Sequence, residues 1–178
     1  DFLPRHDNAA IFLDSGSTTS YFAQLLCEGT RAQDCSIVTN SLPIALDLSS
    51  AGLDGVQLLG GSVRAITQAV VGATALRTLA LLRADVAFIG TNALTIDHGL
   101  STADSQEAAV KSAMVTNAQK VVVLCDSSKI GNDYLVSFAP LDAIDIVITD
   151  SGAPETFLED LERNDIEVVL APVTSSTH

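Results

Sequence analysis

The stretch FLDSGSTT, residues 12–19, contains the pattern that decides the fold. An apolar strand pattern ends at Asp14, and a glycine and four hydroxyl residues then follow before the chain turns apolar again. This order is typical of a strand that leads directly into the first turn of a helix, which we predict at residues 17–28. Strands that alternate with helices are the repeating unit of α/β folds.

Short apolar, β-branched runs recur between helical patterns along the rest of the chain. Most of them are apolar on both faces, as in strands that helices cover on both sides. The alternation predicts an α/β fold with a mostly parallel sheet flanked by helices. We expect strands at residues 9–14, 36–40, 56–61, 85–90, 121–126, 144–150 and 166–171, and helices at residues 17–28, 42–51, 72–83, 104–118 and 154–164.

Two segments, residues 62–72 and 91–103, do not fit the alternation. Both follow a predicted strand and are rich in Gly, Thr or other polar residues, so we expect irregular segments over the carboxyl edge of the sheet. The helix after the second segment has the clearest start. Asp104 and Glu107 have the spacing of a capping box, in which each residue satisfies an amide near the other.

The charge of the chain excludes one class of function and constrains another. Its 178 residues are about one domain by length. Nine basic against 22 acidic residues give a net charge of −13, the opposite of the basic surface that binds a phosphodiester backbone. We therefore expect no direct DNA binding. A phosphate ligand would have to be captured by local donors that overcome the repulsion.

Other features indicate a protein of the cytoplasm without a metal or cofactor. No apolar run reaches the roughly 18 residues of a membrane span, and the start lacks a basic and then apolar leader. Three cysteines without CxxC spacing are interpreted as buried small hydrophobes, and three scattered histidines do not indicate a metal site. These residues are Cys27, Cys35, Cys125, His6, His98 and His178.

The residues that follow the predicted strands share one chemistry. In an open α/β sheet, ligands bind in the crevice outside the carboxyl ends of the strands. Six of the predicted strands end in small, hydroxyl or amide residues, which suit a polar ligand. These strand ends are residues 14–17, 39–41, 60–62, 90–92, 126–129 and 149–151.

The hydroxyl-rich start of the first helix has two interpretations. A helix N-terminus presents unpaired amides and the positive end of the helix dipole, so it binds anions, and Gly16 permits a close approach of the backbone. Alternatively, Ser17 is an ordinary N-cap. No GxGxxG follows a strand, and neither GxxxxGK[ST] nor GxSxG occurs, so dinucleotide and hydrolase functions have no support.

Three charged residues also have two interpretations each. Glu107 and Lys111 stand at i, i+4 on one helix face, where they form either a solvated ion pair or contacts to a sugar hydroxyl and an anion. Lys129 directly follows a predicted strand in a chain with only nine basic residues. It is either a surface lysine or a phosphate ligand.

Nine short motifs follow one another along the chain: IFLDSGSTT, IVTNSLPIA, LLGGSVR, VVGATA, ADVAFIGTNAL, HGLST, EAAVKSAM, VVVLCDSSKIG and IDIVITD. As an ordered set they strongly resemble the C-terminal effector-binding domain of DeoR-type bacterial transcriptional regulators, and the resemblance covers about residues 9–171. The resemblance implies a fold similar to ribose-5-phosphate isomerase and the CoA transferases, a Rossmann-like fold. It also implies a phosphorylated sugar or polyol as effector and a homo-oligomer, a dimer or tetramer.

The resemblance also implies a domain organisation and a set of ligand-binding residues. We expect residues 1–178 to form a single effector-binding domain, with operator DNA bound only by an N-terminal winged helix-turn-helix that this chain does not contain. The residues carried over from the family are Asp14, Ser15, Gly16, Ser17, Thr18, Thr19, Thr39, Asn40, Gly60, Gly61, Gly90, Thr91, Asn92, Gly99, Ser101, Glu107, Lys111 and Lys129.

Two other functions stay open at this stage. One is a sugar-phosphate isomerase, which needs a carboxylate base. In the related enzymes the loop after the fourth strand carries several acids, whereas GTNALTIDHG, residues 90–99, has only Asp97, so we expect a sensor and no enzyme. The other is a scaffold for oligomerisation, in which part of the apolar segment 70–83 forms a subunit interface instead of core.

Overall fold

A seven-stranded parallel sheet forms the centre of the fold, as the alternation of strands and helices predicts. The computed structural model describes residues 2–6, 8–29 and 32–171. All six pairings between neighbouring strands of this sheet are parallel. The spatial order is β12 (Glu167–Ala171), β11 (Ile146–Asp150), β9 (Ala118–Leu124), β6 (Ala84–Gly90), β1 (Ala10–Leu13), β2 (Ser36–Thr39) and β3 (Val56–Leu58).

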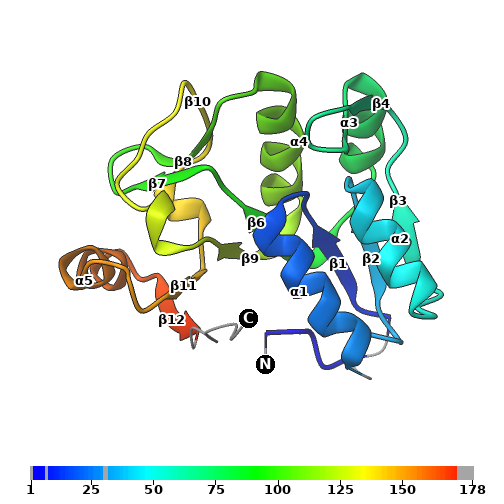
Figure 1. Ribbon diagram of the computed structural model, residues 1–178, viewed down its shortest axis with the longest axis horizontal. Coiled ribbons are helices and arrows are strands. Elements are labelled where there is room, and N and C mark those ends of the chain that lie inside the picture. Colours follow the sequence, from blue (N-terminus) through cyan, green and yellow to red (C-terminus); the bar gives the residue numbers. More distant parts are fainter. Residues whose placement is uncertain (1, 7, 30–31, 172–178) are drawn as a thin grey trace, which may run out of the picture.

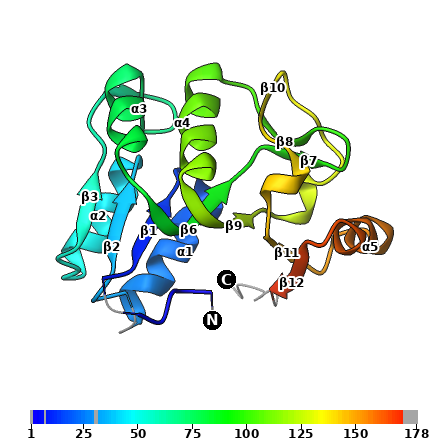
Figure 2. The same ribbon diagram turned by 180° about the vertical axis from the view of Figure 1, so that it is seen from behind.

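Helices cover both faces of this sheet, which explains why its strands are apolar on both sides. Figures 1 and 2 show α1 and α2 on one face and α4 on the other. Alternate residues of β1 point to the two cores, with Ile11 packed beneath α1 and α2 and Phe12 packed beneath α3 and α4. The helices are α1 (Ser17–Glu28), α2 (Leu42–Ser50), α3 (Ala73–Ala80), α4 (Ser105–Thr116) and α5 (Glu155–Arg163).

The two segments predicted to be irregular contain short antiparallel strands instead. Residues 62–72 form a hairpin of β4 (Ser62–Arg64) and β5 (Ala69–Val71). Residues 91–103 form β7 (Ala93–Thr95) and β8 (Gly99–Thr102), which pair with an unpredicted strand, β10 (Val136–Ala139). The prediction failed because these strands have only three or four residues, and β8 buries Ser and Thr side chains that read as loop residues in the sequence.

The expected boundaries of the other strands and helices agree with the structure to within three residues. The capping box is only half formed. Asp104 accepts hydrogen bonds from the amides of Gln106 and Glu107, at 3.0 and 2.9 Å, and so caps α4. The Glu107 carboxylate does not return to this cap, because it accepts hydrogen bonds from Arg64 and Thr67 instead.

Cys35 and Cys125 are buried as predicted, but Cys27 is partly exposed, so its interpretation as a core residue is wrong. Among the residues that the structure describes, no group of three His, Cys, Asp or Glu side chains could hold a metal ion. None of the described helices could cross a membrane, since the longest have 12 residues and a span needs about 20. The tail predicted to fray, residues 173–178, lies outside the described residues.

Gly99 begins β8 with a backbone conformation that favours glycine, φ +69°. A Cβ atom here would lie 2.2 Å from the carbonyl oxygen of Ala139, the residue that ends β10. The glycine is therefore required for the pairing of β8 with β10. Its role in the fold is conformational, since Gly99 does not line the pocket described below.

We predict that Gly99→Ala lowers the free energy of unfolding by about 2–3 kcal/mol, because it adds backbone strain to a steric clash. Urea denaturation measures the change. Gly29→Ala is the matched control, because Gly29 has φ −96° and its Cβ would meet nothing closer than 3.6 Å. Equal unfolding midpoints for the two variants would contradict the role assigned to Gly99.

Candidate functional site

A pocket of about 150 Å³ lies at the carboxyl ends of β1 and β6. From β1 the chain proceeds to β2 and β3 on one side, and from β6 it proceeds to β9 and β11 on the other. The connections that follow β1 and β6 therefore run to opposite sides. Open α/β sheets bind ligands at such switch points, where the strand order reverses. The pocket is lined by Ser15, Gly16, Ser17, Thr18, Thr67, Gly90, Thr91, Asn92, Glu107, Lys111 and Lys129.

The first turn of α1 forms one wall of the pocket and has no side-chain cap. The N-cap is Gly16, with φ 150°, and no side chain accepts a hydrogen bond from the first amides. The interpretation of Ser17 as the N-cap is therefore wrong, because Ser17 is the first helical residue. The hydroxyls of Thr19 and Ser20 donate to the carbonyl of Gly16, at 2.9 and 2.8 Å. The amides at this helix end are left available to an anion.

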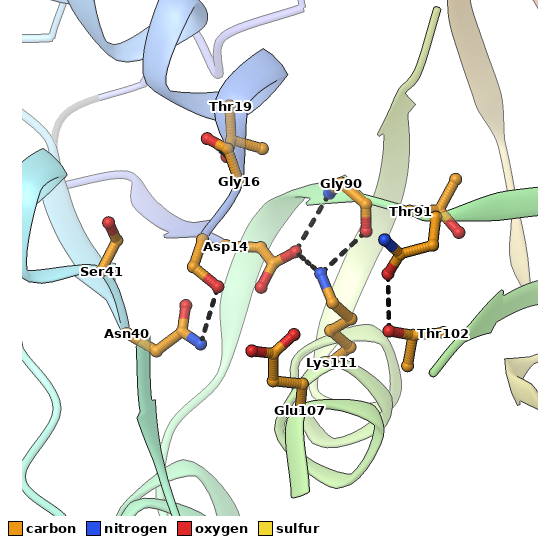
Figure 3. Close-up of polar contacts among 12 residues, drawn as sticks. Asp14, Gly16, Thr19, Asn40, Ser41, Gly90, Thr91, Thr102, Glu107 and Lys111 are labelled. Atoms are coloured by element: carbon orange, nitrogen blue, oxygen red, sulfur yellow. Dashed lines mark hydrogen bonds and ion pairs between the residues drawn. The ribbon is translucent and has the colours of Figure 1, made fainter. Parts of the chain in front are cut away.

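A buried ion pair between Asp14 and Lys111 lies behind this wall (Figure 3). Asp14 is fully buried at the end of β1, and the Lys111 side chain from α4 is 5% exposed. The Lys111 ammonium also donates to the carbonyl of Gly90 at 2.9 Å, and the Gly90 amide donates to Asp14 at 3.1 Å. Burial raises the pKa of Asp14 above its ordinary value of 3.8, and Lys111 offsets part of this effect.

A second acid–base pair connects α4 to the β4–β5 hairpin. The Arg64 guanidinium contacts both Glu107 and Asp104, the latter at 3.1 Å. The Thr67 hydroxyl donates to the same Glu107 oxygen at 2.6 Å. The solvated Glu107–Lys111 pair considered above is therefore not formed, because each residue has a partner from another part of the chain.

Thr91 and Asn92 form the wall next to β8. The Thr91 hydroxyl lies 2.7 Å from the carbonyl of Ala93 and 3.2 Å from that of Ser101. The Asn92 side-chain oxygen accepts from the Thr102 hydroxyl at 2.6 Å. This bond directs the Asn92 amide group, and Asn92 itself is exposed at the pocket.

Lys129 ends the short 3-10 helix η1 (Ser127–Lys129), which Asp126 caps by accepting from the amide of Ser128 at 3.0 Å. Among the residues that the structure describes, none makes a hydrogen bond or ion pair with the Lys129 ammonium. It is therefore an uncompensated positive charge at the pocket, whereas Lys111 is neutralised by Asp14.

Ten of the predicted residues line the pocket, and eight do not. Asp14 and Thr19 are buried directly behind it, and Asn40 reaches it only through a 3.5 Å contact with the Ser15 hydroxyl. Thr39 instead accepts from the amide of Ser41 at 3.0 Å. The residues outside the pocket are Asp14, Thr19, Thr39, Asn40, Gly60, Gly61, Gly99 and Ser101.

Two residues of the hairpin, Arg64 and Thr67, were missed by the sequence prediction. Arg64 could have been identified from the sequence. Lys129 was chosen because basic residues are scarce in this chain and it follows a predicted strand, and Arg64 also follows a predicted strand, the third. Thr67 had no such signal, since one Thr among the polar residues of an expected loop carries no information about its direction.

The family of the chain follows from comparison with known sequences. Residues 6–151 match the family described as the DeoR C terminal sensor domain. The chain belongs to this family. The similarity seen in the ordered motifs is thus confirmed.

Two regulators are similar to this sensor domain over most of its length. The HTH-type transcriptional regulator GlpR of Haloferax volcanii is 37% identical over 92% of the chain and 62% of that protein. The HTH-type transcriptional repressor GlcR of Bacillus subtilis is 31% identical over 93% of the chain and 62% of that protein. The chain thus spans less than two thirds of the length of these relatives.

Among solved structures, the sensor domain has the fold of ribose-5-phosphate isomerase A from Methanocaldococcus jannaschii. The TM-score is 0.50 and the identity 19%, over 71% of this chain and 48% of the enzyme. The expected similarity of fold is confirmed. At this identity the likeness concerns the fold alone.

We predict that Lys111→Met lowers the free energy of unfolding by about 3–5 kcal/mol at pH 8, because it leaves the Asp14 carboxylate buried without its partner. Folded Asp14 then binds a proton more readily than unfolded Asp14, so stability falls as the pH rises and the loss shrinks as the pH falls toward 5. Urea denaturation across this pH range measures the effect.

Lys120→Met is the matched control, since Lys120 is an exposed lysine of β9. It should change stability by less than about 0.5 kcal/mol. A Lys111→Met variant that is as stable as Lys120→Met at pH 8 would show that the buried pair does not hold α4 to β1.

Proposed function

We propose that residues 1–178 form the effector-binding domain of a transcriptional repressor and that the pocket binds a phosphorylated sugar or polyol. One observation carries the proposal: the uncapped N-terminus of α1 and the unpartnered ammonium of Lys129 line the same small pocket. Both favour an anion, in a chain whose net charge of −13 otherwise repels one.

The phosphate end of the ligand is assigned to the first turn of α1. The amides of Ser17 and Thr18 offer directional hydrogen bonds, and the hydroxyls of Ser15, Ser17 and Thr18 add further donors for phosphate oxygens. Lys129 supplies the positive charge. Lys111 is a weaker candidate for this role than its position in the sequence suggested, because Asp14 already neutralises it.

The sugar end is assigned to the opposite wall, which offers both donors and acceptors. Asn92 and Thr91 provide amide and hydroxyl groups, and Glu107 and Thr67 provide a carboxylate and another hydroxyl. Such groups match the hydroxyls of a polyol, each of which both donates and accepts. This wall suits a hydroxylated ligand better than an apolar one.

An isomerase is less well supported by the same geometry. Asp97, the only carboxylate in the segment 90–99, is exposed and does not line the pocket. Glu107 is the one carboxylate on the pocket lining, and Arg64 and Thr67 bind one of its oxygens. A base held by two donors is poorly suited to removing a proton from carbon. We therefore propose a sensor and no enzyme.

The rest of the proposed mechanism concerns how effector binding affects DNA binding. The relatives are named as helix-turn-helix regulators and are longer than the chain, so we propose that DNA is bound by a separate N-terminal domain and that the protein acts as a dimer or tetramer. Effector binding is proposed to order residues 91–103 and 127–135 over the pocket. It can alter DNA binding only if the two states differ in effector affinity.

We predict that Lys129→Ala weakens binding of a phosphorylated sugar by at least about tenfold, the effect of one charge-assisted hydrogen bond. Binding of the same sugar without its phosphate should change little, because the ammonium has no other partner there. Calorimetric titration of a panel of hexose, pentose and triose phosphates, and of their unphosphorylated forms, measures both.

Lys120→Ala is the control for loss of a positive charge away from the pocket. An equal loss of affinity for phosphorylated and unphosphorylated sugars would reject the role of Lys129. If NMR shows that the chain converts a bound sugar phosphate into another, the sensor proposal is wrong and the chain is an isomerase. A chain whose thermal unfolding is unchanged by the entire panel would be a scaffold.

A further inference from the structure

The segment after Lys129 lies against the β7–β8 hairpin and is held there at a few points. Residues 130–135, here called the strap, connect η1 to β10, and Gly131 to Leu135 are all exposed. Near its start, the backbone of the strap contacts the β7–β8 hairpin, where the Gly131 amide donates to the carbonyl of Leu94 at 2.9 Å. Lys129 therefore lies at the base of a segment that packs against little core.

One side chain, Asp133, connects the far part of the strap to the hairpin. One of its carboxylate oxygens lies 2.6 Å from Nδ1 of His98, and the other accepts from the Ser101 hydroxyl at 3.2 Å. The Ser101 hydroxyl in turn accepts from the amide of Tyr134 at 2.9 Å. The strap is thus fastened by side chains of the turn between β7 and β8 and of β8 itself.

This fastening is connected to the pocket through both of its ends. The carbonyl of Ser101 accepts from the hydroxyl of Thr91, which lines the pocket. The strap follows directly after Lys129, which also lines the pocket. A change in the contact of Asp133 with His98 would therefore move the strap and, with it, the ammonium of Lys129.

We propose that Asp133 is a positioning residue that holds Lys129 against a bound anion, and that protonation of His98 strengthens this hold. The proposal rests on the proposed function, because it describes how affinity for the phosphate group is regulated. It adds a site outside the pocket that makes effector affinity depend on pH.

The charges around His98 determine the sign of this dependence. Its hydrogen bond to Asp133 raises the pKa of His98 above its ordinary 6.5, and Asp97 in the same turn acts in the same direction. The side chain that faces it from β10 is Ser137, whose hydroxyl donates to the His98 carbonyl at 3.0 Å. The His98 bond lowers the pKa of Asp133. The pair is therefore ionised below the raised pKa of His98, and the hold weakens as the pH rises through that pKa.

The effect of the His98–Asp133 contact on anion affinity is small because both side chains are exposed to solvent. His98 and Asp133 side chains are 65% and 43% exposed, and exposed ion pairs contribute little because water screens them. Loss of the contact should weaken anion binding by about two- to fivefold. The effect should be smaller than that of removing Lys129 itself.

The test uses inorganic sulfate as the probe, since sulfate keeps both charges between pH 6 and 8.5 whereas phosphate titrates. Its affinity for the 178-residue chain, measured by NMR titration, should fall across this range. His98→Asn should weaken binding at pH 6 and remove the pH dependence. His6→Asn, at the other described histidine, should retain it, because His6 pairs with Asp85 away from the strap.

A double-mutant cycle then separates positioning from a general loosening of the fold. Asp133→Ala should weaken sulfate binding about two- to fivefold in the wild-type background and have no effect in the Lys129→Ala background. Equal effects in the two backgrounds would overturn the proposal, as would a pH dependence that survives His98→Asn. Urea midpoints establish that each variant is folded under the conditions of the titration.

The same experiment distinguishes the two proposals made for this site. If sulfate binds the wild-type chain and Asp133→Ala binds it equally well, the positioning role is wrong and the anion site stands. If the wild-type chain binds neither sulfate nor any phosphorylated sugar, the proposed function fails, and the inference about Asp133 fails with it.

Discussion

The buried pair of Asp14 and Lys111 is the interaction on which the pocket depends. It joins the end of β1 to α4, and through the amide and carbonyl of Gly90 it also joins the end of β6. These three elements meet where the strand order reverses. A charge that is fully buried costs too much free energy to remain unpaired, so the pair fixes the position of α4 over the sheet.

The pairing of charges also determines what the pocket can attract. Lys111 is neutralised by Asp14, and Arg64 is neutralised by Glu107 and Asp104. What remains is the partial positive charge of the α1 N-terminus and the ammonium of Lys129. A strongly acidic chain thus retains, at the pocket, the amide and ammonium donors that an anion sensor requires. The fold shared with an isomerase does not by itself supply a catalytic base.

Much of this arrangement could be predicted from the sequence, because it depends on local patterns. Apolar runs located the parallel strands, and the position after each strand identified most of the pocket lining. The partners of Glu107 and Lys111 could not be predicted. Their i, i+4 spacing suggested a pair, but Arg64 and Asp14, which are distant in sequence, are closer in the fold. The short antiparallel strands were missed for the same reason, since their pairing is set by tertiary contacts.

The central claim is that the backbone amides of the first turn of α1 bind the phosphate group. The most direct measurement is an ¹H–¹⁵N NMR titration of the chain with a phosphorylated sugar and with its unphosphorylated form. The amide resonances of Gly16, Ser17 and Thr18 should show the largest shifts, and only with the phosphorylated ligand. Shifts of equal size with both ligands, or shifts that leave these three amides unchanged, would contradict it.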